Sequence, residues 1–268
     1  MSEFRRRRRP PLAGPLILIA IGLLFLLNNF GLLPIDLWKL WPLILILIGL
    51  ELILARGRPW AGRQRFDRDL GDLKRAHIEI EAGIGDLKVG HLGDPTKLVE
   101  GRFETGISPS FDVSEGEGKL CLARWGGEFV FFPPLWRILG DRRVKLTPQI
   151  PLTMSVDAWI GDVDLDLSSL KLTDLHVDSK IGEISVEFPQ TAGLTTAFLR
   201  SYVGDMTLDI PSGVAARIKA SLGSLASLRI DRDRFKRVGG FYVSDDFESA
   251  ENKLDLRVEA LIGDVKIL

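Results

Sequence analysis

Beyond residue 75 the chain repeats a short pattern of apolar and polar positions around a glycine. Each copy has an apolar residue, Gly, a short polar residue and then apolar residues in alternation, as in Ile160-Gly161-Asp162-Val163-Asp164-Leu165. The glycines that carry the pattern are Gly85, Gly161, Gly182, Gly204, Gly223 and Gly263. From Gly161 onward they fall 21, 22, 19 and 40 residues apart, and 40 is close to two periods. A period of about this length with strand-like alternation predicts a stacked β-solenoid.

The alternation on either side of each glycine predicts two short strands joined at a corner. Apolar residues mostly occupy positions −1, −3, −5 and −7 before the glycine, and the inward-facing set resumes at +2 and +4 after it. The −3 residue is small in all six copies, which leaves room for a bulky side chain from a neighbouring strand. Glycine supplies the positive φ or the close backbone approach that a corner needs. The Gly223 copy is degenerate, because Ser227 takes its +4 position.

Two stretches interrupt this regularity. Strand-like pieces without a clear motif lie between Gly85 and Gly161, and residues 231–251 have the composition of a polar insertion. The final copy ends at Leu268 without an obvious capping helix. Because an uncapped strand can pair with another chain, this end is a candidate site of self-association.

The first part of the chain is continuously apolar instead. Residues 12–30 and 37–54 are two runs of about the length that a bilayer core requires, and the join between them allows only a hairpin turn. A signal peptide is the competing interpretation of the first run. No small-residue cleavage site appears, however, and a second apolar run follows at once. The two runs therefore predict a helical transmembrane hairpin.

The chain thus divides into four parts. They are a basic N-terminus at 1–11, a two-helix transmembrane hairpin at 12–55, a basic juxtamembrane linker at 56–75, and a β domain at 76–268 with an irregular aromatic insert at 123–143. The predicted fold class is an all-β soluble domain, a β-solenoid of stacked short strands, preceded by an α-helical transmembrane hairpin.

Arginines on both sides of the hairpin predict its orientation. Those nearest to the apolar runs are Arg5, Arg6, Arg7, Arg8, Arg9, Arg56 and Arg58, whereas the connecting turn carries only Asp36 and Lys39. The positive-inside bias then places both termini, and the β domain, in the cytoplasm. An arginine run can bind nucleic acid. Beside a membrane helix, however, we expect the arginines to set the membrane topology and to bind anionic lipid. The first 75 residues are basic, whereas the whole chain has a net charge of −1, so the rest of the chain is acidic. An acidic β domain disfavours a nucleic-acid partner.

No group of residues suited to catalysis appears in the sequence. His77, His91 and His176 have no metal-binding spacing, and the chain lacks a phosphate loop, a nucleophile elbow and a Cys-x-x-Cys pair. The single Cys121 excludes an internal disulfide and is expected to be a bystander. We therefore expect neither an enzyme nor a cofactor.

A carboxylate follows most of the repeat glycines. The residues are Asp86, Asp162, Glu183, Asp205 and Asp264. Stacked rungs would align them in a column, and calcium-binding solenoids use acidic residues at turns. Such loops normally supply several oxygens per turn, whereas here there is usually one. Solvation of the corner is the expected role, and a metal ladder is the alternative.

Aromatic residues are concentrated in one segment between the repeats. The candidate contact residues are Trp125, Phe129, Phe131, Phe132, Leu135 and Trp136. They either pad the irregular end of the solenoid or form an exposed apolar patch that touches the bilayer surface or a partner.

Both halves of the chain resemble a known bacterial family. Gly14-Pro15-Leu16-Ile17, Asn28-Asn29-Phe30-Gly31, Trp41-Pro42 and Ile48-Gly49 resemble the two-helix membrane region of LiaI- and LiaF-type envelope-stress proteins. The glycine-anchored repeats resemble the C-terminal β domain of such proteins, sometimes called a toastrack domain. The aromatic insert and residues 231–251 depart from the family pattern.

The resemblance implies a non-enzymatic protein of the bacterial cell membrane that modulates signalling after cell-envelope damage. In that family the LiaF-type member restrains a sensor histidine kinase. The first expectation is therefore a regulatory adaptor whose partners are membrane lipid and a membrane signalling protein such as a sensor kinase. The alternative is a scaffold at the membrane that polymerises through its β-solenoid.

Overall fold

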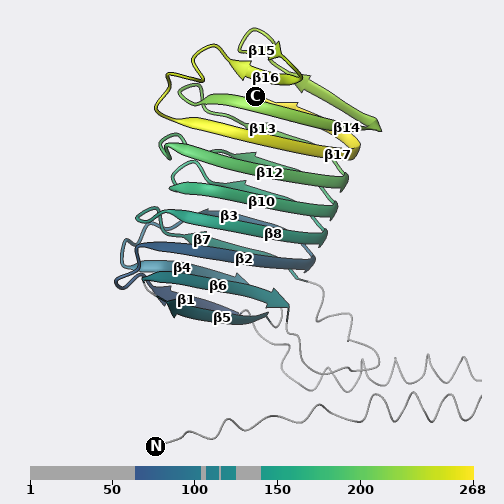
Figure 1. Cartoon of the computed structure of the whole chain (residues 1–268). Coiled ribbons are helices and arrows are strands. Elements are labelled where there is room, and N and C mark those ends of the chain that lie inside the picture. The colour runs from purple at the N-terminus through teal and green to yellow at the C-terminus, as the bar shows by residue number, and fades with distance from the viewer. Residues whose placement is uncertain (1–63, 104–106, 115, 125–139) are drawn as a thin grey trace, which may run out of the picture. The chain divides into compact units, whose positions relative to one another are not determined.

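The computed structural model describes residues 64–103, 107–114, 116–124 and 140–268 (Figure 1). The predicted hairpin at 12–55 and the six aromatic-insert candidates lie outside these ranges. Within the ranges, no helix has the length and the apolar character needed to cross a bilayer.

One sheet of 17 strands contains all the secondary-structure elements of the described residues. The strands are β1 (Gln64–Asp69), β2 (Arg75–Ile84), β3 (Leu87–His91), β4 (Lys97–Phe103), β5 (Ile107–Ser114), β6 (Glu117–Arg124), β7 (Arg142–Leu146), β8 (Leu152–Ile160), β9 (Val163–Asp166), β10 (Leu172–Ile181), β11 (Ile184–Glu187), β12 (Leu194–Val203), β13 (Met206–Asp209), β14 (Ala215–Ile230), β15 (Phe235–Val238), β16 (Phe241–Ser244) and β17 (Lys253–Ile267).

The repeats form rungs of a solenoid, as their pattern predicts. Each rung has a long strand, a glycine corner and a short strand; examples are β8–β9 and β10–β11, and β17 runs through its corner as one strand. Long strands pair with long strands and short strands with short strands, in parallel. The ladder of long strands faces the viewer in Figure 1. Equivalent positions therefore stack in columns along the solenoid.

The stacking order differs from the chain order at two places. The rung β2–β3 lies between β6–β7 and β8–β9, because β2 pairs with both β6 and β8. Likewise β17 lies between β12 and β14, although β14 precedes it in the chain. The solenoid therefore has one intercalated rung toward each end.

This order corrects the expectation for the end of the stack. The strand that ends near Leu268 is internal, flanked by β12 and β14, so it offers no free edge there. The last rung is β14, and the hairpin β15–β16 pairs antiparallel with it at Arg217 and Ile218. The predicted polar insertion at 231–251 therefore contains the hairpin that covers part of this end.

Inward-facing side chains fill the interior as the alternation predicts. Val156, Val177, Leu199 and Val258 occupy the −5 column and are fully buried. The small −3 residues are also buried in five copies, namely Ala82, Ala158, Ser179, Ser201 and Ala260.

The expectation for the −1 position is wrong. Ile160, Ile181, Val203 and Ile262 are 44%, 48%, 41% and 38% exposed. At the corners of Gly161, Gly182, Gly204 and Gly263 two successive residues, −2 and −1, face solvent. The alternation therefore ends at −3, and the apolar −1 residues line the outside of the corner.

The β domain also begins earlier than its sequence suggested. β1 pairs antiparallel with β4, so residues 64–69 of the predicted linker at 56–75 belong to the sheet. Phe66 packs against the core, whereas Arg65, Asp67 and Arg68 are exposed. Such a charged strand is protected against further pairing at the edge of a sheet, and its composition looks like that of a linker.

Candidate docking surfaces of the solenoid

The corner glycines stack directly on one another. Gly182 has a φ of +140°, and a Cβ on it would lie 2.0 Å from the carbonyl oxygen of Gly161. A side chain there would therefore collide with the backbone of the next rung. Gly223 lies outside this column, because the register between β14 and β17 shifts between Leu222 and Leu225.

The column has a further member that the repeat pattern missed. Gly140 donates its backbone N–H to the carbonyl oxygen of Ile84 at 3.0 Å, so it stacks on Gly85. A signal was present, since Gly140 lies 21 residues before Gly161 and Asp141 follows it. The apolar pattern does not identify this copy, because its +2 position is Arg142, which is charged and yet buried.

Three of the carboxylates after the glycines accept backbone N–H groups from a neighbouring rung. Oδ1 of Asp86 accepts the N–H of Asp162 at 3.1 Å, and Oδ1 of Asp162 accepts the N–H of Glu183 at 2.9 Å. Oδ1 of Asp205 accepts the N–H of Asp264 at 2.8 Å. Each of these three carboxylates, of Asp86, Asp162 and Asp205, thus ties one corner to the next. Within the described ranges, no three metal-binding side chains gather as a metal site would require.

The −1 residues, which are half-buried at Ile84 and exposed from Ile160 onward, form a continuous apolar line along the corner. We call this line the corner ridge; it consists of Ile84, Ile160, Ile181, Val203 and Ile262, which are register neighbours on successive rungs. From Ile160 onward the −2 residues beside it are also large, namely Trp159, Lys180, Tyr202 and Leu261, whereas Gly83 lies beside Ile84. Most of the exposed large hydrophobic residues of the described chain therefore gather on this one edge.

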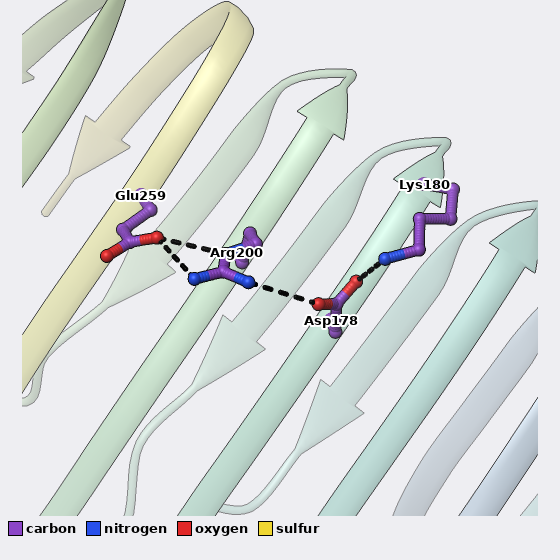
Figure 2. A network of polar contacts seen from close by, with 4 residues as sticks. All are labelled: Asp178, Lys180, Arg200 and Glu259. Atoms are coloured by element: carbon purple, nitrogen blue, oxygen red, sulfur yellow. Dashed lines mark hydrogen bonds and ion pairs between the residues drawn. The ribbon is translucent and has the colours of Figure 1, made fainter.

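The long-strand face beside the ridge carries ion pairs that cross the rungs. Figure 2 shows Arg200 between Asp178 and Glu259, with Nε and Nη2 donating to Oε2 of Glu259 at 2.9 and 2.8 Å. Nη1 of Arg200 lies 3.8 Å from Asp178, which also accepts from Lys180. The network joins β10, β12 and β17. Each exposed ion pair of this kind contributes little to stability. The main effect of these pairs is that charged side chains cover this face.

A polar hollow of about 330 Å³ lies on the same face over β2, β8 and β10. Ser155 is short and lies between the longer Glu79 and His176, and Cys121 lies beyond Glu79 on β6. A hydrogen bond from Lys119 lowers the pKa of Glu79. Burial raises the pKa of the Cys121 thiol, and Glu79 adds to the shift, so the thiolate is disfavoured.

The three histidines occupy separate outward positions with different neighbours. His77 Nε2 lies 3.0 Å from Glu79 Oε1, His91 lies 3.7 Å from Asp166, and the ring of His176 stacks on Phe198. In these contacts, no acidic residue is shared by two of the histidines. The arrangement supplies neither a general-base pair nor a nucleophile for catalysis.

The aromatic candidates Trp125, Phe129, Phe131, Phe132, Leu135 and Trp136 lie outside the described residues. Their segment nevertheless has defined roots. β6 and β7 pair with the long and short strands of one neighbouring rung, so they are the two arms of a rung that is interrupted at its corner. The insert therefore leaves and rejoins the solenoid at the corner edge.

Comparisons with known proteins agree with these features. A family model described as the LiaI-LiaF-like transmembrane region matches residues 12–53. A second model, described as the N-terminal domain of toast_rack, DUF2154, matches residues 61–209. None of the curated proteins searched matches the chain.

Solved structures show a similar fold. The crystal structure of a proposed cell adhesion protein from Clostridium sporogenes aligns with a TM-score of 0.65 and 18% identity, covering 76% of this chain and 97% of that one. A proposed adhesin from Bacteroides fragilis aligns with a TM-score of only 0.28 and 10% identity, over 78% of this chain and 99% of that one. At this identity the first alignment supports the β fold alone.

The second family model covers more than half of the chain, and the first places a membrane region ahead of it. The described all-β solenoid has the fold expected of such a domain. Neither family description names an enzyme, and the LiaF-like membership suggests a regulatory role at the membrane in envelope stress. The chain therefore belongs to the toastrack family, as a LiaF-type membrane protein.

Proposed function

We propose that this protein is a non-enzymatic, membrane-anchored regulatory adaptor. It modulates a cell-envelope stress signalling system by contacting a membrane signalling protein such as a sensor kinase. The observation that carries the proposal is the apolar corner ridge, because soluble surfaces rarely expose an apolar line of this extent unless something binds there. The family membership supports a regulatory role in the membrane.

The anchor is a two-helix hairpin at 12–55 with both chain ends in the cytoplasm. The arginines that flank the apolar runs support this orientation, and they also suit contact with anionic lipid headgroups. Protease treatment of intact cells and of inverted vesicles tests the arrangement. Cleavage within the β domain only in inverted vesicles is expected, and cleavage in intact cells would contradict it.

The partner contact also includes the aromatic insert, through Trp125, Phe129, Phe131, Phe132, Leu135 and Trp136. The concentration of aromatic residues in this one segment of the sequence is typical of an apolar patch that touches a partner. Because the anchor already holds the domain near the membrane, even a weak contact becomes effective there.

Site-specific cross-linking in living cells tests the adaptor function. A photoreactive residue replaces Val203 on the ridge or Phe131 in the insert of the full-length chain, and cross-linked products are purified from membranes. We expect the same signalling protein from both positions. The matched control places the probe at Val238, which is exposed on the β15–β16 hairpin and distant in register from the ridge. Recovery of only the chain itself at every dose would contradict the adaptor.

The alternative function, self-assembly at the membrane, is favoured by the other end of the solenoid. Beyond Ile218, no described strand pairs with the outer edge of β14, so residues 225–230 present a free edge. The opposite end is protected, because β1 is charged and β5 contains Pro109. One free end favours a closed two-fold dimer rather than a polymer.

A substitution at this edge tests the dimer. If two copies of β14 pair antiparallel about Leu228, Ser227 of each copy lies opposite Arg229 of the other. Ser227→Lys then places like charges across the pair, while Ser227 is exposed in the single chain. Sedimentation of the full chain in lipid nanodiscs should show the dimer lost in this variant. A parent chain that stays monomeric at high concentration would remove this function.

A further inference from the structure

We propose that the corner ridge binds an amphipathic helix that carries Lys or Arg on one flank of its apolar stripe. The inference rests on the proposed function, because it names the chemistry of the partner segment. It concerns the described ridge alone and does not depend on the aromatic insert.

The backbone at the ridge excludes an added strand as the occupant. The rungs already bond to one another at the corner: Gly161 N–H donates to Ile181 O at 2.9 Å, and Gly182 N–H donates to Val203 O at 3.0 Å. No free edge is therefore available for strand addition, and the occupant must satisfy its own backbone. An α-helix does so, and it offers a line of apolar side chains for the contact.

The length and spacing of the ridge also suit a helix. Five ridge residues on successive rungs, about 4.8 Å apart, span about 19 Å. A helix covers that length with about 13 residues, at 1.5 Å per residue. Its apolar side chains recur about once per turn, every 5.4 Å, which is close to the separation of the rungs.

The charge beside the ridge selects a basic flank. Asp162, Glu183, Asp205 and Asp264 form an exposed carboxylate column on the short-strand side of the corner. On the other side lie Trp159, Tyr202 and Leu261, which extend the apolar surface, and Lys180, a cation paired with Asp178 that offers no anionic partner to a second basic flank. A helix with cations on only one side of its stripe therefore complements the edge. An anionic bilayer surface does not, because the carboxylate column would face lipid of the same charge.

Binding of designed peptides to the full-length chain tests the inference. The chain is held in nanodiscs of zwitterionic lipid, with empty nanodiscs as background. Three labelled helical peptides of about 16 residues are compared by fluorescence anisotropy: a leucine stripe flanked by Lys, the same stripe flanked by Glu, and a Lys-flanked peptide with Ser in place of Leu. Only the first should bind, and its affinity should fall as salt is raised.

Substitutions assign the binding to the ridge. Ile181→Ser together with Val203→Ser should weaken the Lys-flanked peptide at least about tenfold, because two half-exposed aliphatic contacts are lost. Glu183→Gln should weaken it about two- to fivefold and reduce its salt dependence. No backbone N–H among the described residues donates to Glu183, so this change leaves the corner bonds intact. Val238→Ser is the matched control, and it should change nothing.

Four results would overturn the inference. They are equal binding of the Glu-flanked peptide, an unchanged affinity in the ridge variant, a ridge variant that instead loses binding to anionic phosphatidylglycerol vesicles, and a ridge variant that instead loses self-association. A melting temperature close to that of the parent shows that the variant is folded. If cross-linking from the insert still recovers a signalling protein while the ridge variant binds the peptide normally, the adaptor function stands and the ridge inference fails.

Discussion

At the scale of single residues, the corner depends on the absence of a side chain. Most glycines of the column hold a positive φ, and each backbone lies against the carbonyl of the preceding rung. The strain of a substituted residue would therefore add to a collision that neither rung can avoid. At a position with a positive φ but no backbone against the site of a Cβ, replacing glycine should cost much less stability.

Gly182→Ala should lower the free energy of unfolding by about 3 kcal/mol or more, since the Cβ meets backbone at 2.0 Å. Gly193→Ala is the matched control, because Gly193 also has a positive φ, +70°, but a Cβ there meets nothing within 4 Å. Its cost should be about 1 kcal/mol. Urea unfolding of both variants measures the difference. Equal losses would show that φ alone, and not the stacking, sets the requirement for glycine.

The −3 column supplies a second prediction at this scale. Ser179 is fully buried, and its hydroxyl has no hydrogen-bond partner among the described residues, whereas alanine fills the same column at other rungs. Ser179→Ala should therefore raise the free energy of unfolding by about 1 kcal/mol.

Ser201→Ala is the control for that change. The Ser201 hydroxyl donates to the carbonyl oxygen of Gly204 at 3.3 Å, so its removal should be neutral or mildly destabilising. Thermal melts of the two variants in the same background provide the comparison. A loss of stability in Ser179→Ala would mean that its hydroxyl is bonded after all, for example to water.

At the scale of elements, the neighbours of a strand need not be its neighbours in sequence. β17 pairs with β12 on one side and with β14 on the other, so among the described strands β14 joins the central ladder through its pairing with β17 alone. A destabilising substitution in β17 should therefore also unfold the strands that are attached through β17.

Leu256→Ala tests this dependence. Leu256 is fully buried, and its truncation should cost about 2–5 kcal/mol. Hydrogen exchange should show β14, β15 and β16 losing protection together with β17, while β2 and β8 keep theirs. Leu194→Ala, at a 59% exposed position, is the control and should leave the exchange pattern unchanged. Protection lost only within β17 would show that β14 is held by other contacts.

The sequence predicted the rungs better than it predicted their order or their outer surface. Alternating residues such as Val156 and Val177 are buried as expected, because period-two patterning reports which side chains face inward. The same pattern is silent about which rung lies beside which, so the place of β17 could not be read from it. Ile181 is exposed although it continues the apolar alternation, because the pattern does not distinguish an apolar corner residue from a core residue.

Several features of the candidate surface could not be predicted from the sequence pattern, because the pattern does not report how the rungs stack on one another. The carboxylate column was visible, but its bonds to successive backbones, such as Asp162 to Glu183, depend on the stacking geometry. The corner ridge exists only because equivalent residues align on parallel rungs. β1 was missed because its charges are typical of a linker.

At the scale of the whole molecule, the described residues form one compact unit that includes none of the residues at 1–62. A chain reduced to residues 61–268 should therefore fold without the membrane region. We expect it to stay in the soluble fraction and to show a β-type circular dichroism spectrum. Its melting temperature should match that of the full chain in nanodiscs. Aggregation of the shortened chain would show that the membrane region contributes to folding.

The intercalation of β17 also has a consequence for synthesis of the protein. β14 leaves the ribosome before β17, while the exposed edge of β12 is already formed. The nascent β14 carries a copy of the same repeat, so it can pair with the free edge of β12 first. It is then displaced from β12 when β17 arrives. Such a detour would make closure of this end a slow step, and a period in which chaperones or neighbouring chains could capture the open ladder.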